Sequence, residues 1–239
     1  MKQEISQDDK TAELLLQHPA LLDPLMSLGV RPGVGDETLM QSCLHTRLHI
    51  DALTSLLNVW VGNNVEEKKI CGIQAYNILP FVDFMQAMLN DVYSRLLLTT
   101  RHTGRLLASI KPEDTENLPI MPFLASLGAQ VENMLKQETE ITYKNWLNTY
   151  DIYCSKQAKN VITIQDAEAE PMTQVADTLD DLASIFVRHI PQQYDGTMYA
   201  AVFQLMTSLR ETMAGLTRVR TKIMLPMVKQ MEKEIAKRK

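Results

Sequence analysis

The chain has 239 residues, of which 45% are hydrophobic and 22% charged, and its net charge at pH 7 is −5. This composition is typical of a globular protein and excludes a disordered or collagen-like chain. The 9 glycines are few for this length, which argues against a turn-rich all-β fold. The chain also has many methionines, 14, and few histidines, 5.

Cysteine spacing and hydropathy exclude several further classes. Cys43, Cys71 and Cys154 have neither CxxC nor zinc-type spacing, so we expect no disulfide framework and no cysteine metal site. Residues 1–12 are polar, which predicts no signal peptide. No apolar run reaches about 18 residues, so we expect no membrane span. A cytoplasmic protein without a membrane partner is therefore predicted.

The charge is distributed unevenly. Residues 217–239 carry eight basic and two acidic side chains, which leaves residues 1–216 with a net charge of −11. These cations would complement the C-terminal dipole of a helix, or they would bind an anionic partner. No aromatic residues interleave with them and the remainder is acidic, so no nucleic-acid partner is expected.

Apolar residues recur at three- and four-residue spacing along most of the chain, which predicts an all-α protein. We expect a small helical N-terminal module of three or four short helices in residues 1–62 and a linker over 63–78. Residues 79–239 would form an up-down four-helix bundle, because four long helices with apolar faces and short connections bury those faces together. The four helices are expected near residues 80–110, 122–155, 170–190 and 196–237.

Turn residues and prolines indicate where the predicted helices begin and end. Val30–Gly35 is a predicted turn, after which Asp36 would cap a helix that starts at Glu37. Three prolines suit the first turns of the long helices, where a missing N–H is harmless; they are Pro80, Pro122 and Pro171. Pro226 lies deep inside the fourth long segment and is predicted to kink it.

Two parts of the chain resemble one known family. Leu21–Val30, the turn Gly33–Gly35, Cys43 and Ile50–Leu53 follow one another as in the small N-terminal domain of the iron–sulfur cluster repair (RIC) di-iron proteins, in the form joined to a hemerythrin-like domain. The C-terminal half is similar to the last two helices of that family. The segments that carry this second likeness are Asp181–Pro191, Leu209–Glu211, Leu216–Val219 and Lys222–Val228.

The resemblance implies a hemerythrin-like bundle, which in that family holds a di-iron site. Its ligands are a lone histidine on the first and third helices and an HxxxE pair on the second and fourth. Imidazole nitrogens bind the irons and the two glutamates bridge them. The spacing of four residues places both ligands of each pair on one helix face.

This chain departs from the ligand pattern. The matching positions, here the former metal-site positions, are Leu89 on the first helix, Met134 and Glu138 on the second, Met172 on the third, and Leu216 and Arg220 on the fourth. On the first two helices the match to the family also allows a second register, with Met85 in place of Leu89 and with Gln137 and Ile141 in place of Met134 and Glu138. Thioether sulfur is a poor ligand for an oxygen-bridged di-iron site, and Arg220 puts a positive charge where a carboxylate belongs. We therefore expect no metal cofactor.

The remaining metal-ligand residue types do not rebuild a site. None of the histidines stands at a ligand register. His45 and His49 lie near Cys43 without a fourth ligand at matching spacing, so a surface role is expected. The RIC pattern also has a cysteine pair near its glycine turn, whereas Val30–Gly35 contains no thiol.

Glu138 and Arg220 are predicted to form an ion pair, because a buried glutamate is costly unless it is paired. We expect the other four former metal-site positions to form a repacked apolar core; the alternative is a small apolar pocket. No nucleophile–base pair or phosphate-binding loop is found in the sequence.

The expected function is that of a metal-free, non-catalytic regulatory or scaffolding module. It would act through protein partners, with homodimerisation and a stress or redox link suggested by the resemblance alone. One alternative is residual di-iron or nitric-oxide and iron-handling chemistry at an atypical metal site. Another is the binding of a small apolar ligand in the vacated cavity.

Overall fold

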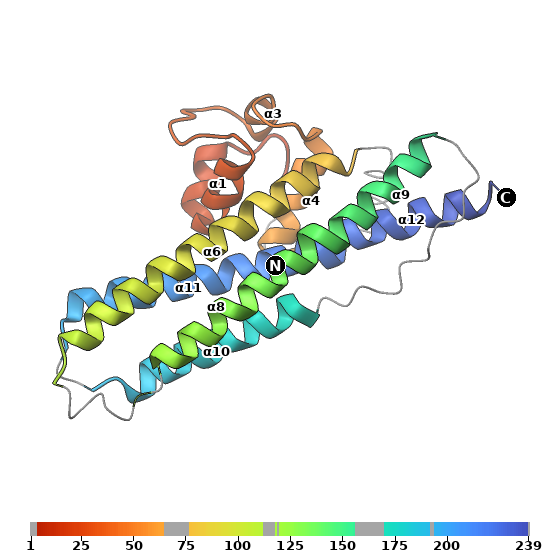
Figure 1. The fold of residues 1–239 in the computed structure, drawn as a ribbon. Helices are drawn as coiled ribbons and strands as arrows, with labels where there is room; N and C mark the ends of the chain where they lie inside the picture. The colour runs from red at the N-terminus through yellow and green to blue at the C-terminus, as the bar shows by residue number, and fades with distance from the viewer. Residues whose placement is uncertain are drawn as a thin grey trace. The chain divides into compact units, whose positions relative to one another are not determined.

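The computed structural model describes residues 4–64, 77–111, 118, 120–155, 170–191 and 194–238. These residues are mostly helical (Figure 1). Within them, extended pairing is limited to one isolated antiparallel bridge between Lys10 and Thr38. The predicted all-α class is therefore confirmed. No helix in these ranges is long and apolar enough to cross a membrane.

The N-terminal part contains short helices, as predicted. They are α1 (Thr11–Gln17), the 3₁₀ turn η1 (Pro19–Leu21), α2 (Leu22–Ser27), α3 (Leu39–Cys43) and α4 (Ile50–Trp60). Each buries at least one apolar side chain, and α4 buries most of its length.

The long helices fall close to the four predicted segments. They are α6 (Leu79–Ala108), α8 (Ile120–Gln137), α9 (Tyr143–Ser155), α10 (Glu170–His189), α11 (Gly196–Val219) and α12 (Leu225–Ala236). Two π-helical turns join consecutive helices: η2 (Glu138–Thr142) links α8 to α9, and η3 (Arg220–Met224) links α11 to α12. The predicted linker over 63–78 lies mostly outside the described residues, so the domain boundaries stay a prediction.

Contacts divide the chain into two compact units. The first unit comprises Met1–Met88, Glu138–Ala169 and Gly215–Lys239, and the second comprises Leu89–Gln137 and Glu170–Ala214. Each unit has its own buried apolar side chains. In the second unit α8 packs against α10, and Thr178 donates a hydrogen bond of 3.0 Å to Gln130 Oε1. In the first unit α9 packs against α12.

The prolines occupy the starts of helices. Pro80, Pro122 and Pro171 lie within the first three residues of α6, α8 and α10, as predicted. Pro226 is the second residue of α12, which begins directly after η3. The long C-terminal helix is thus interrupted here by a π-helical turn, because a proline cannot donate the hydrogen bond that an unbroken helix requires.

The predicted cap at Asp36 is wrong. Helix α3 begins at Leu39, and its N-cap is Thr38. Thr38 Oγ1 accepts from the Gln41 N–H at 3.4 Å, and Gln41 Oε1 accepts from the Thr38 N–H at 2.8 Å. This reciprocal capping box satisfies two backbone donors at once. Asp36 is left to pair with Lys10 on the surface, at 2.9 Å.

Trp60 ties α4 to α11 within the first unit. Its indole Nε1–H donates to the Ala20 carbonyl at 3.0 Å, and its ring meets that of Phe84 edge-on at 5.9 Å. A Cβ atom on Gly215 would lie 2.6 Å from the indole ring, so α11 approaches this closely because residue 215 has no side chain. Arg218 donates to the carbonyls of Val59, at 3.0 Å, and of Trp60, which satisfies the C-terminus of α4.

Candidate functional site

All six former metal-site positions are buried, with at most 1% of each side chain exposed. Glu138, Leu216 and Arg220 belong to the first unit. Leu89, Met134 and Met172 belong to the second.

Burial also separates the alternative registers on the second long helix. Gln137 is exposed and Ile141 is 58% exposed, so this pair faces solvent. Met134 and Glu138 are the buried pair with the same spacing. On α6, Met85 and Leu89 are both buried, so both registers remain open there.

The structure contains the ion pair between Glu138 and Arg220. Arg220 Nη2 lies 3.1 Å from Glu138 Oε1, and Arg220 Nε lies 3.1 Å from Oε1 and 3.2 Å from Oε2. Both side chains are 1% exposed. Two guanidinium nitrogens therefore hold the carboxylate, a geometry that adds direction to the charge attraction.

Each partner opens a π-helical turn. Glu138 is the first residue of η2 and Arg220 is the first residue of η3. Such turns are rare and occur frequently at functional sites. The sequence prediction gave one continuous helix over 122–155 and a helix kinked at Pro226 over 196–237, and it included neither π-helical turn. Two signals were present: Pro226 after η3, and the β-branched residues of Thr139–Thr142, which lower helix propensity.

Two aromatic residues of α9 complete this cluster. Tyr143 and Trp146 are fully buried, and their ring centroids are 5.7 Å apart. Arg220 Cζ lies 5.5 Å from the centroid of the Trp146 ring, within the range of a cation–π contact. We call Glu138, Tyr143, Trp146 and Arg220 the Glu138 cluster.

The cluster shifts the titration of Tyr143. Burial raises the pKa of the Tyr143 hydroxyl well above its ordinary value of 10, the charge and the hydrogen-bonding proximity of Glu138 raise it further, and the Arg220 charge opposes this. Each cause acts on the phenolate: burial and a like charge disfavour it, and a cation favours it. Tyr143 therefore stays protonated at neutral pH.

Tyr143 Oη and Trp146 Nε1 have no hydrogen-bond partner of acceptable geometry in the described part of the chain. Most buried polar groups in native proteins are hydrogen-bonded to protein or to ordered water. Both atoms therefore indicate where a further partner would sit.

The histidines and the N-terminal thiol do not assemble a metal site. His45 and His49 are exposed in the connection between α3 and α4, and His49 Nδ1 caps α4 by accepting from the Asp51 N–H at 3.4 Å. Cys43 donates to the Leu48 carbonyl at 3.2 Å. Across the described ranges, no group of three or more His, Cys, Asp or Glu side chains is arranged to hold a metal ion.

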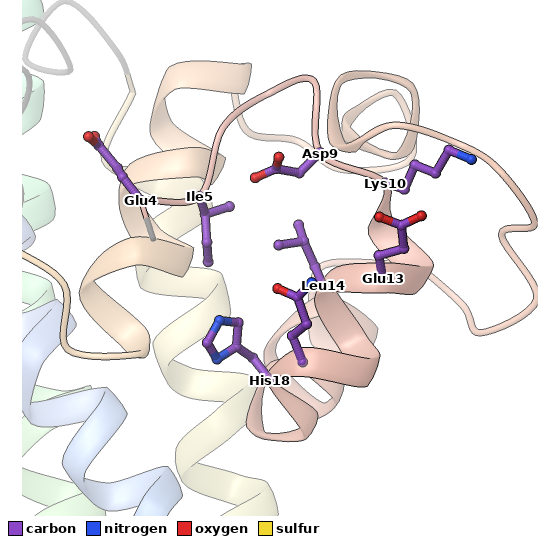
Figure 2. A pocket seen from close by; sticks show the side chains of 8 residues that line it. Glu4, Ile5, Asp9, Lys10, Glu13, Leu14 and His18 are labelled. Atoms are coloured by element: carbon purple, nitrogen blue, oxygen red, sulfur yellow. The ribbon is translucent and has the colours of Figure 1, made fainter. Parts of the chain in front are cut away.

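A small surface pocket of about 90 Å³ lies in the N-terminal part of the first unit (Figure 2). Its lining residues are Glu4, Ile5, Asp9, Lys10, Glu13, Leu14, Gln17 and His18. Figure 2 shows the Lys10 ammonium directed away from the pocket, consistent with its pairing to Asp36. Asp9 Oδ2 accepts from the Ser6 N–H at 2.8 Å. Three of the eight lining residues are acidic, and the lining contains no nucleophile–base pair.

Comparison with known proteins finds no matching family model, no matching curated protein and no matching solved structure. The likeness to the RIC and hemerythrin-like proteins therefore rests on the sequence motifs described above.

Proposed function

We propose that this chain is a metal-free, non-catalytic member of the hemerythrin-like and RIC group that acts as a regulatory or scaffolding module. Its long helices would form the up-down bundle of that group. The observation that carries the proposal is the buried Glu138–Arg220 ion pair, at positions where the resemblance places the two bridging glutamates.

The charges at this pair support the proposal. Arg220 engages both oxygens of the Glu138 carboxylate, so those oxygens are already occupied by a cation. A guanidinium remains protonated at any physiological pH. A divalent iron bound at the same carboxylate would therefore face an adjacent buried positive charge, which is strongly unfavourable at low dielectric.

The other former metal-site positions supply no alternative ligands. Leucine has no donor atom, and the methionines at 134 and 172 offer thioether sulfur, which prefers softer metals than those of an oxygen-bridged di-iron centre. The donor set does not fit a di-iron site, and we assign no reaction to one.

Surface features support a role in protein contacts. Leu16 and Leu44 in the N-terminal part are 82% and 84% exposed, and large apolar side chains at this exposure are available to a partner or a second copy.

Three arginines of the basic C-terminal segment contact other parts of the chain. Arg218 donates to the Val59 carbonyl at the end of α4, Arg220 pairs with Glu138, and Arg238 donates to the Tyr153 carbonyl at 2.7 Å. These contacts support a structural use for part of the basic charge.

The proposal is tested by iron reconstitution of two proteins in parallel. The wild type and a variant with the family ligands restored (Leu89→His, Met134→His, Met172→His, Leu216→His and Arg220→Glu) are incubated with Fe(II) without oxygen, desalted and analysed for iron. We expect the wild type to retain no stoichiometric iron and the folded variant to gain it. Stoichiometric iron in the wild type, with an oxo-bridge absorption band after the desalted protein is exposed to oxygen, would refute the proposal.

The oligomeric part of the proposal has its own measurement. Size-exclusion chromatography with light scattering gives the molar mass directly. We expect the mass of a homodimer, and Leu16→Ser and Leu44→Ser variants identify whether the N-terminal surface forms it.

A further inference from the structure

In the Glu138 cluster, two buried groups that can donate a hydrogen bond make none of acceptable geometry, although the Glu138 carboxylate lies close to the Tyr143 hydroxyl. Tyr143 Oη and Trp146 Nε1 lack a partner among the described residues, although both side chains are 0% exposed. Leaving such a group unsatisfied is unfavourable, because it loses its hydrogen bonds to water and gains none in return. Proteins usually avoid this cost with an internal water that makes two to four hydrogen bonds.

The two donors belong to one neighbourhood. Tyr143 and Trp146 are three residues apart on α9, so they lie on the same face of the helix, and their rings are 5.7 Å apart. The Arg220 guanidinium lies 5.5 Å from the Trp146 ring, and Glu138 is close enough to raise the pKa of Tyr143. The π-helical turns η2 and η3 begin at the two charged residues, so the regular α-helical hydrogen-bond pattern is interrupted here.

We propose that this cluster is a binding site for an internal water molecule, held by the Trp146 indole N–H and the Tyr143 hydroxyl beside the Glu138–Arg220 ion pair. An indole N–H can only donate, so the ligand must accept a hydrogen bond from it. The tyrosine hydroxyl can donate or accept, and water can complement either choice. The inference rests on contacts within the first unit and does not depend on the proposed function.

The charge of the cluster favours a neutral ligand. The carboxylate of Glu138 and the guanidinium of Arg220 are in contact and compensate each other, so the cluster has no net charge to attract an anion. Water meets the hydrogen-bonding need without adding charge.

The test uses the two tryptophans of this chain, one of which is a built-in control. In protein labelled with ¹⁵N, the two indole N–H signals are assigned with Trp146→Phe, and their cross-relaxation with water is measured. We expect a cross-peak between water and the Trp146 indole proton. We expect none at Trp60, which is buried but already donates to the Ala20 carbonyl.

Variants of α9 test whether Tyr143 shares the ligand. Tyr143→Phe should shift the Trp146 signal and abolish its water cross-peak, whereas Tyr150→Phe, at a partly exposed position on the same helix, should leave both unchanged. The proposal is overturned by a wild-type Trp146 signal without a water cross-peak, by equal cross-peaks at both tryptophans, or by a cross-peak that survives Tyr143→Phe. A saturable shift of the Trp146 signal with added nitrate would show an anion site and would also overturn it.

Discussion

Removing the Glu138 carboxylate should destabilise the protein strongly. In Glu138→Ala, Arg220, which is 1% exposed in the wild type, loses an ion-pair partner whose oxygens lie 3.1 to 3.2 Å away. Opposite unit charges about 4 Å apart attract by about 4 kcal/mol at an effective dielectric constant of about 20. Breaking a buried pair by removing one partner typically costs about 3–5 kcal/mol. Both figures predict a loss of about 3–5 kcal/mol in the free energy of unfolding.

Urea and thermal unfolding monitored by circular dichroism measure this loss. At about 2–4 °C per kcal/mol for a chain of this size, the melting temperature should fall by about 6–20 °C. Glu140→Ala is the matched control, because Glu140 lies in the same π-helical turn but is exposed. Its change should stay within about 0.5 kcal/mol. A Glu138→Ala protein as stable as Glu140→Ala would refute the reasoning.

The double substitution Glu138→Leu with Arg220→Met tests whether the predicted loss of stability comes from an unpaired buried charge or from the change of side chain. Replacing both partners by apolar residues of similar volume leaves no uncompensated charge, and such replacements are often neutral or stabilising by about 1–4 kcal/mol. The single variants for comparison are Glu138→Leu and Arg220→Met. We expect the free energy of unfolding of the double variant to exceed that of the less stable single variant by at least about 3 kcal/mol, which is the scale of the loss when a buried pair is broken. A double variant as unstable as the single ones would show that the charges do not account for the loss.

Three further predictions follow from the same structure. Gly215→Ala should lower the free energy of unfolding in urea by about 1–3 kcal/mol, because the new methyl group overpacks against the Trp60 ring. The control Gly128→Ala has open space around its Cβ position and should raise the free energy of unfolding by about 0.4–1 kcal/mol. Equal effects of the two changes would contradict the close approach of α11 to Trp60. Thr38→Ala should cost about 1 kcal/mol through loss of the capping box, and no loss would contradict the corrected start of α3. Because the pKa of Tyr143 is raised in the folded protein, its contribution to stability is complete below about pH 10, the pKa of tyrosine in the unfolded chain, and is lost as the pH rises above that value. Tyr143→Phe should therefore reduce the fall in the free energy of unfolding at alkaline pH. An unchanged dependence of stability on pH would contradict the raised pKa.

Much of the fold follows from local patterns in the sequence. Apolar periodicity located all of the long helical segments, because a helix that buries one face repeats its apolar residues every three to four positions. Pro80, Pro122 and Pro171 marked helix starts for the physical reason that a first-turn residue needs no N–H partner. The cap at Thr38 was missed because a capping box depends on the residue three positions later, here Gln41, and not on the acidic residue nearest the turn.

The site was predictable only in part. The ion pair followed from two charged residues placed opposite each other by the resemblance, since a buried charge needs a partner. The π-helical turns were not predicted, because they change the hydrogen-bond register without changing the apolar pattern. The buried donors Tyr143 and Trp146, and the contact of Gly215 with Trp60, depend on packing between residues far apart in the sequence, which periodicity does not report.

The central claim is that a buried ion pair stands at the positions where the resemblance to the RIC proteins places two iron-bridging glutamates. The most direct test is the iron content of the wild-type chain after anaerobic reconstitution with Fe(II) and exposure to oxygen, read by metal analysis and by the absorption spectrum. The account predicts iron well below one atom per chain and no oxo-bridge band. Stoichiometric iron that disappears in Glu138→Ala would contradict it.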